Sequence, residues 1–141
     1  MDALSLIYNT RGKIYSNQEK WQDAEVAFGK CVAITKTVDD KSLFYMKRLV
    51  NLAEVQEKRN RLQACLRTAN QAHALSESTI KTVPHVFIIK ECLQCMCRVY
   101  RKLDKQDKLI ETLKEMELEC IRLRNVYDEL ENQTKQKLIL N

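Results

Sequence analysis

Glycine and proline are scarce in this chain, which has two glycines and one proline among 141 residues. These residues build most of the tight turns that join β-strands, so a fold rich in strands and hairpins is disfavoured. Two glycines are also too few for most phosphate-binding loops, and no zinc-protease or nucleophile-elbow motif occurs in the sequence. We therefore expect a helical protein that is not an enzyme and that has no catalytic residues and no cofactor.

Long apolar segments are absent as well, because the longest uncharged apolar run is far too short to span a bilayer. The start of the sequence lacks the charged and apolar regions of a secretory signal. Charged residues make up 30% and hydrophobic residues 45% of the chain, which is typical of a folded globular domain. We expect one soluble, cytoplasmic domain over 1–141, whose six cysteines are reduced thiols.

Positive charge is concentrated in the middle of the chain, although the net charge is only +5. Residues 41–104 carry 12 basic and 5 acidic side chains, whereas 1–40 and 105–141 each have a net charge of −1. Such an excess attracts acidic groups. It favours an acidic partner near the middle of the chain, and it keeps open an alternative, an RNA-binding helical-repeat module.

A repeat runs through the chain, and most of its positions stay apolar or small in all three copies. The second copy follows the first by 41 residues and the third follows the second by 44. The positions are Tyr8, Gly12, Tyr15, Trp21, Ala24, Phe28, Cys31 and Ile34, then Leu49, Ala53, Gln56, Leu62, Cys65, Ala69, Ala72 and Leu75, then Leu93, Cys97, Tyr100, Gln106, Leu109, Leu113, Met116 and Glu119.

The spacing predicts two helices per copy, because steps of three and four residues mark one face of an α-helix. Asn17–Lys20, Asn60–Arg61 and Asp104–Lys105 are the expected turns between the helices of a pair. We expect small residues where a partner helix crosses closely, as at Gly12 and Ala53. The expected helices start at Asp2 or Ser5 and end at 17, then cover 19–38, 41–58, 61–78, 84–103 and 105 to the end. A generic amphipathic bundle would show a similar periodicity.

The segments GKIY (12–15), WQDAEVAF (21–28) and NLAEV (51–55) are similar to the signature of the tetratricopeptide repeat (TPR) family. The spacing of 41 to 44 residues resembles the long repeats, of about 40 residues, found in kinesin light chain and cell-polarity adaptors. The resemblance implies an all-α fold, an α-solenoid of three TPR-like helical hairpins with an extended C-terminal helix. Its repeats would cover about 4–38, 41–79 and 83–121, with the extension at about 122–139. It also implies a protein-binding scaffold or adaptor that holds a peptide or helix of a partner in a concave groove.

Polar residues on the first helix of each hairpin are the candidates for this groove, because the repeat pattern does not use them for packing. They are Asn9, Thr10, Lys13, Lys47, Asn51, Glu54, Gln94, Arg98 and Arg101. Asn51 matches an asparagine that the family often uses to bind a peptide backbone, and an amide can both donate and accept hydrogen bonds. A merely solvated polar face remains an equal alternative. Glu54 would repel phosphate, which favours protein over nucleic acid as the partner.

Basic residues also gather at the three expected turns within the hairpins, where stacking would bring them to one rim. These residues are Lys20, Lys58, Arg59, Arg61, Arg101, Lys102, Lys105 and Lys108. They would steer an acidic partner, or they simply solvate the turns.

The last helix carries a heptad-like apolar seam over Leu109, Leu113, Met116, Cys120, Leu123, Tyr127 and Leu130. We expect its first half to pack on the fifth helix and its second half to extend past the domain. Exposed apolar residues often mark interfaces. The candidates for self-association as a homodimer, or for a partner helix, are Tyr127, Leu130, Leu138, Ile139 and Leu140. The alternative is a tail that folds back or frays.

Cys92, Cys95 and Cys97 invite comparison with a metal site, but a structural zinc needs four converging ligands. On a helix, Cys97 points away from the other two, and no second Cys-x-x-Cys follows. We therefore expect buried thiols and no metal, and structural roles for the two histidines, His73 and His85.

Overall fold

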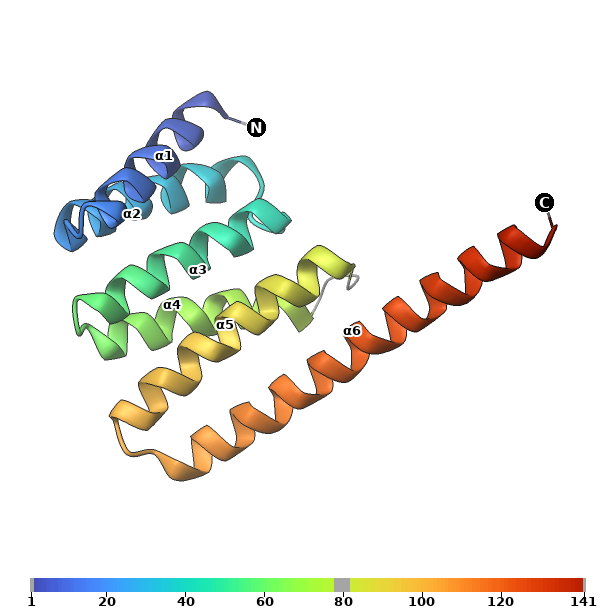
Figure 1. The fold of residues 1–141 in the computed structure, drawn as a ribbon. Helices are drawn as coiled ribbons and strands as arrows, with labels where there is room; N and C mark the ends of the chain where they lie inside the picture. The colour runs from blue at the N-terminus through green and yellow to red at the C-terminus, as the bar shows by residue number, and fades with distance from the viewer. Residues whose placement is uncertain (1, 78–81, 141) are drawn as a thin grey trace.

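The computed structural model describes residues 2–77 and 82–140 and is built of α-helices, with no β-strand in those ranges (Figure 1). This confirms the predicted all-α class. Consecutive helices pack in pairs, α1 with α2, α3 with α4 and α5 with α6, and the pairs stack in chain order. The helices are α1 (Ala3–Asn17), α2 (Trp21–Val38), α3 (Leu43–Lys58), α4 (Leu62–Glu77), α5 (Val83–Lys102) and α6 (Gln106–Leu140).

The described helices begin within about two residues of the predicted positions, and side chains cap two of them. The Asp2 carboxylate accepts a hydrogen bond from the Leu4 N–H at 2.9 Å, and the Ser42 hydroxyl accepts one from the Tyr45 N–H at 3.1 Å. The proline at 84 lies in the first turn of α5, as expected. The expected ends of the fourth helix at 78 and of the second repeat at 79 lie outside the described residues.

The three turns inside the hairpins share one backbone geometry. Glu19, Asn60 and Asp104 each have a left-handed conformation, with φ of 58°, 58° and 54°. In each turn the N–H of the next residue donates to the carbonyl oxygen five positions before it, at 2.8 to 2.9 Å. Because these residues are also 41 and 44 positions apart, the repeat seen in the sequence is a repeat of backbone structure.

Small residues lie at the helix crossings, as the pattern predicts. Gly12 is buried, and Ala24, Ala53 and Cys65 are at most 1% exposed. A Cβ atom added at Gly12 would lie 2.5 Å from the ring of Phe28 on the facing helix, so any larger residue would force that ring or the helix to shift. The larger core lies between α3, α4 and α5, where residues such as Leu49, Val50 and Leu93 are fully buried.

The seam expected on α6 is only partly correct. Leu109 is buried against the hairpin, but Leu113 is 44% exposed and Cys120 is exposed, while Thr112 and Glu119 are buried instead. An α-helix turns by 100° per residue, so both sets of residues form a stripe, and packing decides which stripe faces inward. Glu115 on α6 pairs with His73 on α4 at 2.7 Å, which favours the observed rotation.

The second half of α6 extends beyond the stacked hairpins, as expected (Figure 1). Every residue of the segment 127–140 is exposed. The five apolar residues predicted as an interface all lie there, with Tyr127 and Leu130 about half exposed and Leu138, Ile139 and Leu140 more than 70% exposed.

Candidate protein-binding groove

The nine predicted groove residues lie on α1, α3 and α5, the first helices of the three hairpins. The groove has two steps, a first step between α1 and α3 and a second step between α3 and α5. Helix α3 packs directly against α5, whereas α1 reaches α3 chiefly through α2. The two steps therefore differ in how much space they leave between the helices.

The first step contains two hollows that meet at Lys13 and Asn51. One has a volume of about 440 Å³ and lies toward the turn ends of the helices, and the other has a volume of about 280 Å³. Both are lined by Lys13 and Asn51. Three of the predicted residues, Lys13, Asn51 and Glu54, thus line the larger of these two hollows.

The larger hollow combines apolar walls with charged and amide groups. Trp21, Phe28 and Val55 supply apolar surface, and the Lys58 ammonium lies 5.9 Å from the centre of the Trp21 ring. Glu54 is the one acidic residue of the lining. Such a hollow suits one apolar side chain of a ligand, with polar groups placed to orient it.

Amide groups join the two helices of the first step. The Asn51 side chain donates a hydrogen bond to the Asn9 side-chain oxygen at 3.4 Å, so these two predicted residues meet across the groove. Thr10 is exposed, and its hydroxyl donates to the Leu6 carbonyl within its own helix at 2.9 Å. Asn9 lines the smaller hollow and Thr10 lines neither.

Ion pairs occupy the second step. Lys47 on α3 pairs with Glu91 on α5 at 2.5 Å. Glu57, on α3 and only 7% exposed in its side chain, accepts hydrogen bonds from Arg98 at 2.9 Å and Lys102 at 3.1 Å. Arg98 and Lys47, expected to face a partner, thus already hold carboxylates of this chain. Of the other predicted residues on α5, Gln94 is half-buried and Arg101 is exposed.

The acidic residues of α3 have opposite shifts in pKa. Burial raises the pKa of the Glu57 carboxyl, but the hydrogen bonds and charges of Arg98 and Lys102 outweigh burial and hold it below its usual value. Burial also raises the pKa of Glu54, and the nearby Glu91 and Glu57 carboxylates add to this, while Lys47 and Arg98 oppose it. The charged form of Glu57 is therefore stabilised, whereas the charged form of Glu54 is destabilised.

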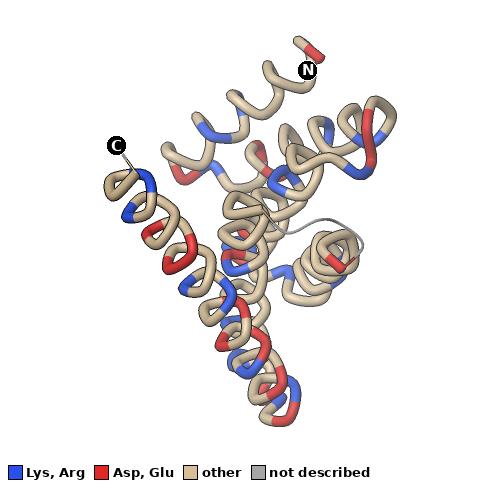
Figure 2. Tube along the Cα trace, turned by 90° about the vertical axis from the view of Figure 1, so that its right-hand side faces the viewer, with Lys and Arg blue, Asp and Glu red and all other residues tan. Residues whose placement is uncertain are grey.

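The expected basic rim is partly neutralised. Arg59 and Arg61 both pair with Glu25 on α2, the first at 3.2 Å, while Lys102 pairs with Glu57 and Lys108 with Glu111 at 3.6 Å. Four of the eight basic residues at the turns thus have acidic partners. Figure 2 shows basic and acidic residues alternating along α6. The turns and α6 therefore do not form a strong, uniformly basic surface.

The cysteines of α5 have separate partners. The Cys92 thiol donates to the Ala69 carbonyl at 3.1 Å, Cys97 contacts the Met116 sulfur at 3.6 Å, and Cys95 lies beside Cys65. In the ranges 2–77 and 82–140, no group of three or more His, Cys, Asp and Glu residues is arranged to hold a metal ion. None of the described helices is both long and apolar enough to cross a membrane.

Sequence comparison adds no relative to this picture, because no protein-family model and no curated protein matches the chain. The residues that the sequence missed are Glu57 and the hollow-lining Ser16, whereas Lys58, predicted for the basic rim, also lines the larger hollow. The only signal in the sequence was helical spacing. These residues lie three or four positions from predicted residues of α1 and α3, and so share a helix face with them.

Proposed function

We propose that this chain is a TPR-type scaffold or adaptor that binds a segment of another protein and catalyses no reaction. The observation that supports this most is the pair of hollows meeting at Lys13 and Asn51 between α1 and α3. We place the partner segment along this first step. The second step is occupied by ion pairs of the chain itself.

The lining of the hollows defines the chemistry of the partner segment. Asn51 binds its main chain through donor and acceptor groups. An apolar side chain enters the larger hollow between Trp21, Phe28 and Val55. An acidic side chain beside it pairs with Lys13. The expected ligand is therefore an extended peptide with neighbouring acidic and apolar residues, and we propose a cytoplasmic setting for the complex.

The single tryptophan of the chain provides a direct test, because it lines the larger hollow. Peptides selected against the intact chain from a random display library are titrated while the Trp21 fluorescence is recorded. The proposal expects enrichment of acidic–apolar peptides and a saturable change in fluorescence. The double variant Lys13→Glu and Asn51→Ala should weaken their binding at least tenfold, which corresponds to about 1.4 kcal/mol.

Arg101→Ala is the matched control, since this exposed cation lies on α5 and lines neither hollow. Its affinity for the selected peptides should stay within about twofold of that of the parent. If the double variant binds the same peptides with the affinity of the parent, the ligand lies elsewhere and the groove assignment fails.

We also propose that the exposed end of α6 mediates self-association of two chains. The support is the apolar group of Tyr127, Leu130 and 138–140, all exposed on one projecting segment. Sedimentation of the intact chain should show a dimer that Leu130→Glu converts to a monomer. A monomer across the measured concentrations, with α6 still helical, would remove this part of the proposal.

A further inference from the structure

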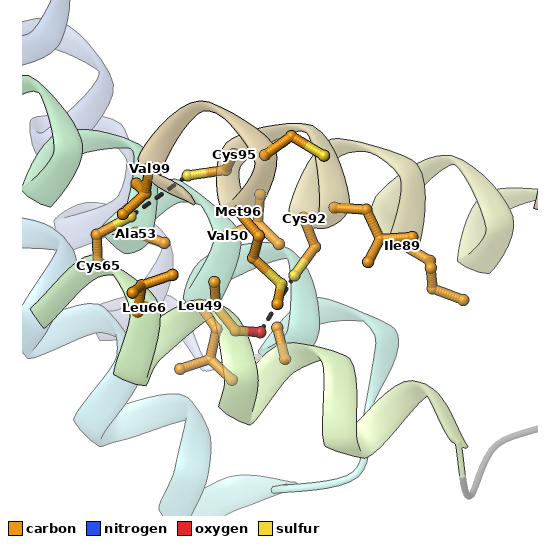
Figure 3. Packing of buried hydrophobic residues seen from close by; sticks show 14 of the residues in the cluster. Leu49, Val50, Ala53, Cys65, Leu66, Ile89, Cys92, Cys95, Met96 and Val99 are labelled. Carbon is orange, nitrogen blue, oxygen red and sulfur yellow. Dashed lines mark hydrogen bonds between the residues drawn. The ribbon is translucent and has the colours of Figure 1, made fainter. Parts of the chain in front are cut away.

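Two buried cysteines lie side by side where the second hairpin meets the third. The Cys65 sulfur on α4 is 3.4 Å from the Cys95 sulfur on α5, and both residues are 0% exposed (Figure 3). A disulfide bond is ~2.05 Å long, so the sulfurs need to approach by only about 1.4 Å. Such a bond would link α4 to α5, two helices that belong to different hairpins.

Charged groups connect this pair of thiols with the surface. The Cys95 thiol lies 3.7 Å from a carboxylate oxygen of Glu57, which is itself only 7% exposed. Arg98 and Lys102 cover that carboxylate, and their side chains are 45% and 48% exposed. One carboxylate and two long, flexible cations therefore separate the sulfurs from water on this side.

The same groups supply what thiol oxidation requires. A reacting cysteine needs a thiolate, a nearby proton acceptor, a second thiol and access for the oxidant. Because Cys65 and Cys95 are 0% exposed, access here requires the half-exposed Arg98 and Lys102 side chains to move aside. The hydrogen bond from Cys95 lowers the pKa of the Cys65 thiol, although burial opposes this effect. The interaction with Cys65 and burial together raise the pKa of Cys95. Cys95 is also the thiol that lies against the Glu57 carboxylate, which can accept its proton. We therefore assign Cys65 as the nucleophile and Cys95 as the second thiol.

The neighbouring cysteines provide an internal contrast. Cys92 lies one turn before Cys95 on the same helix and is 2% exposed, but its thiol donates to a backbone carbonyl. Cys31 donates to the Ser5 carbonyl at 3.2 Å and accepts a hydrogen bond from Arg48. Burial alone is thus common to several thiols, whereas the sulfur–sulfur approach beside a carboxylate belongs to Cys65 and Cys95.

We propose that Cys65 and Cys95 form a two-electron redox site that is oxidised by hydrogen peroxide or a small organic hydroperoxide to a disulfide joining the second and third hairpins. With hydrogen peroxide, the Cys65 thiol gives up its proton, its sulfur attacks one peroxide oxygen, the O–O bond breaks, and the leaving hydroxide takes up that proton and departs as water. An organic hydroperoxide would release the corresponding alcohol in this step instead. Cys65 becomes a sulfenic acid. The Cys95 sulfur then attacks the Cys65 sulfur and gives its proton to Glu57, the S–O bond breaks, and the oxygen leaves as a second water after taking up that proton.

The disulfide would change the mechanics of the stack. It links two positions 30 residues apart in the chain, which restricts the unfolded chain and stabilises the fold. It also fixes α4 against α5 at the contact between hairpins. Oxidation therefore stiffens the second step of the groove without adding any group to the first.

The test uses the full chain with Cys120→Ser, because Cys120 is exposed and would otherwise form bonds between molecules. The protein is treated with hydrogen peroxide, alkylated and digested without reductant. The proposal expects an intact mass lower by two hydrogens, a peptide linking Cys65 to Cys95, and a Tm higher by several degrees. Dithiothreitol should reverse the mass change and the Tm change together.

Serine variants separate a specific pair from general thiol oxidation. Cys65→Ser and Cys95→Ser should each lose the internal bond and the Tm increase, whereas Cys92→Ser should retain both. The proposal is overturned if Cys65 and Cys95 of the parent remain open to alkylation after peroxide treatment and unfolding. It is overturned equally if the bond involves Cys92, or if the bond forms and the Tm does not rise.

Discussion

The two steps of the groove use equivalent positions of the repeat and yet differ in character. In the second step, Glu57 on α3 pairs with Arg98 and Lys102 on α5. In the first step, the position equivalent to Glu57 is Ser16, 41 residues earlier. The positions equivalent to Arg98 and Lys102, 44 residues earlier, are Glu54 and Lys58. These three residues line the larger hollow of the first step.

The smaller hollow follows the same rule. In the first step, the positions equivalent to Lys47 and Glu91 are Leu6 and Lys47. Leu6 and Lys47 cannot form an ion pair because only one of them is charged. Leu6 and Lys47 line the smaller hollow. Both hollows thus occupy the places that ion pairs fill one repeat later. The comparison teaches that the first step is open because its side chains are short or mismatched in charge.

The largest effect is expected from breaking the second step. The double variant Arg98→Ala and Lys102→Ala leaves the buried Glu57 carboxylate unpaired, and this should lower the free energy of unfolding by about 3 kcal/mol. This figure is at the low end of the usual range because both cations are about half exposed. Urea unfolding at neutral pH measures the change. Arg101→Ala, on the same helix, should change it by less than about 0.5 kcal/mol.

A somewhat smaller loss in the free energy of unfolding is expected from a substitution at the helix crossing beside the larger hollow. Gly12→Ala places a methyl group 2.5 Å from the ring of Phe28, which also lines the hollow, and such overpacking costs about 1–3 kcal/mol. Gly29→Ala is the control, since nothing lies within 4 Å of the added carbon and a helical glycine is replaced. It should stabilise the chain by about 0.5–1 kcal/mol. Equal losses in both variants would contradict the crossing at Gly12.

Introducing the charged residues of the second step at the equivalent positions of the first step should fill the larger hollow. In the double variant Ser16→Glu and Glu54→Arg, the new carboxylate can pair with the new arginine and with Lys58. A gain of about 1 kcal/mol in the free energy of unfolding is expected, from charged hydrogen bonds partly exposed to water. Binding of the peptides selected on the parent should be lost at the same time. Retained binding, with raised stability, would show that the hollow is not the ligand site.

The smallest effect is a difference in pH dependence between the two glutamates of α3. The pKa of Glu57 is depressed in the folded chain, so its stabilising contribution is present above the unfolded value, near 4.5, and is lost as the pH falls through the folded value. Glu57→Gln should therefore flatten the acid loss of stability. The pKa of Glu54 is raised, so its penalty exists at neutral pH and disappears on acidification. Glu54→Gln should raise the Tm at pH 7 and leave it unchanged near pH 3, and the reverse order would contradict the assignments.

Local signals made most of the helical framework predictable from the sequence. The caps at Asp2 and Ser42, the turn residues and the small residues at the crossings act within one helix or one hairpin. The amide pair of Asn9 and Asn51 joins two residues that the repeat placed on one face. The inward stripe of α6 was not predictable in the same way, because its rotation depends on a contact with His73 in another hairpin.

Contacts between hairpins account for the other omissions. Glu57 has no unusual neighbours in the sequence, and its role appears only when α5 brings Arg98 and Lys102 against it. The approach of Cys65 to Cys95 likewise depends on how closely α4 and α5 pack. Such distances follow from the stacking angle between repeats, which the periodicity of one repeat does not contain.

The left-handed residues of the three turns also affect the unfolded chain. Glu19, Asn60 and Asp104 adopt a conformation for which glycine is the easier choice, and holding an L-residue there costs about 1 kcal/mol or more. A glycine would relieve this strain but would give the denatured ensemble more backbone freedom to lose on folding. Because none of these three turns uses glycine, the unfolded chain has less backbone freedom to lose, and this offsets part of the entropy cost of folding.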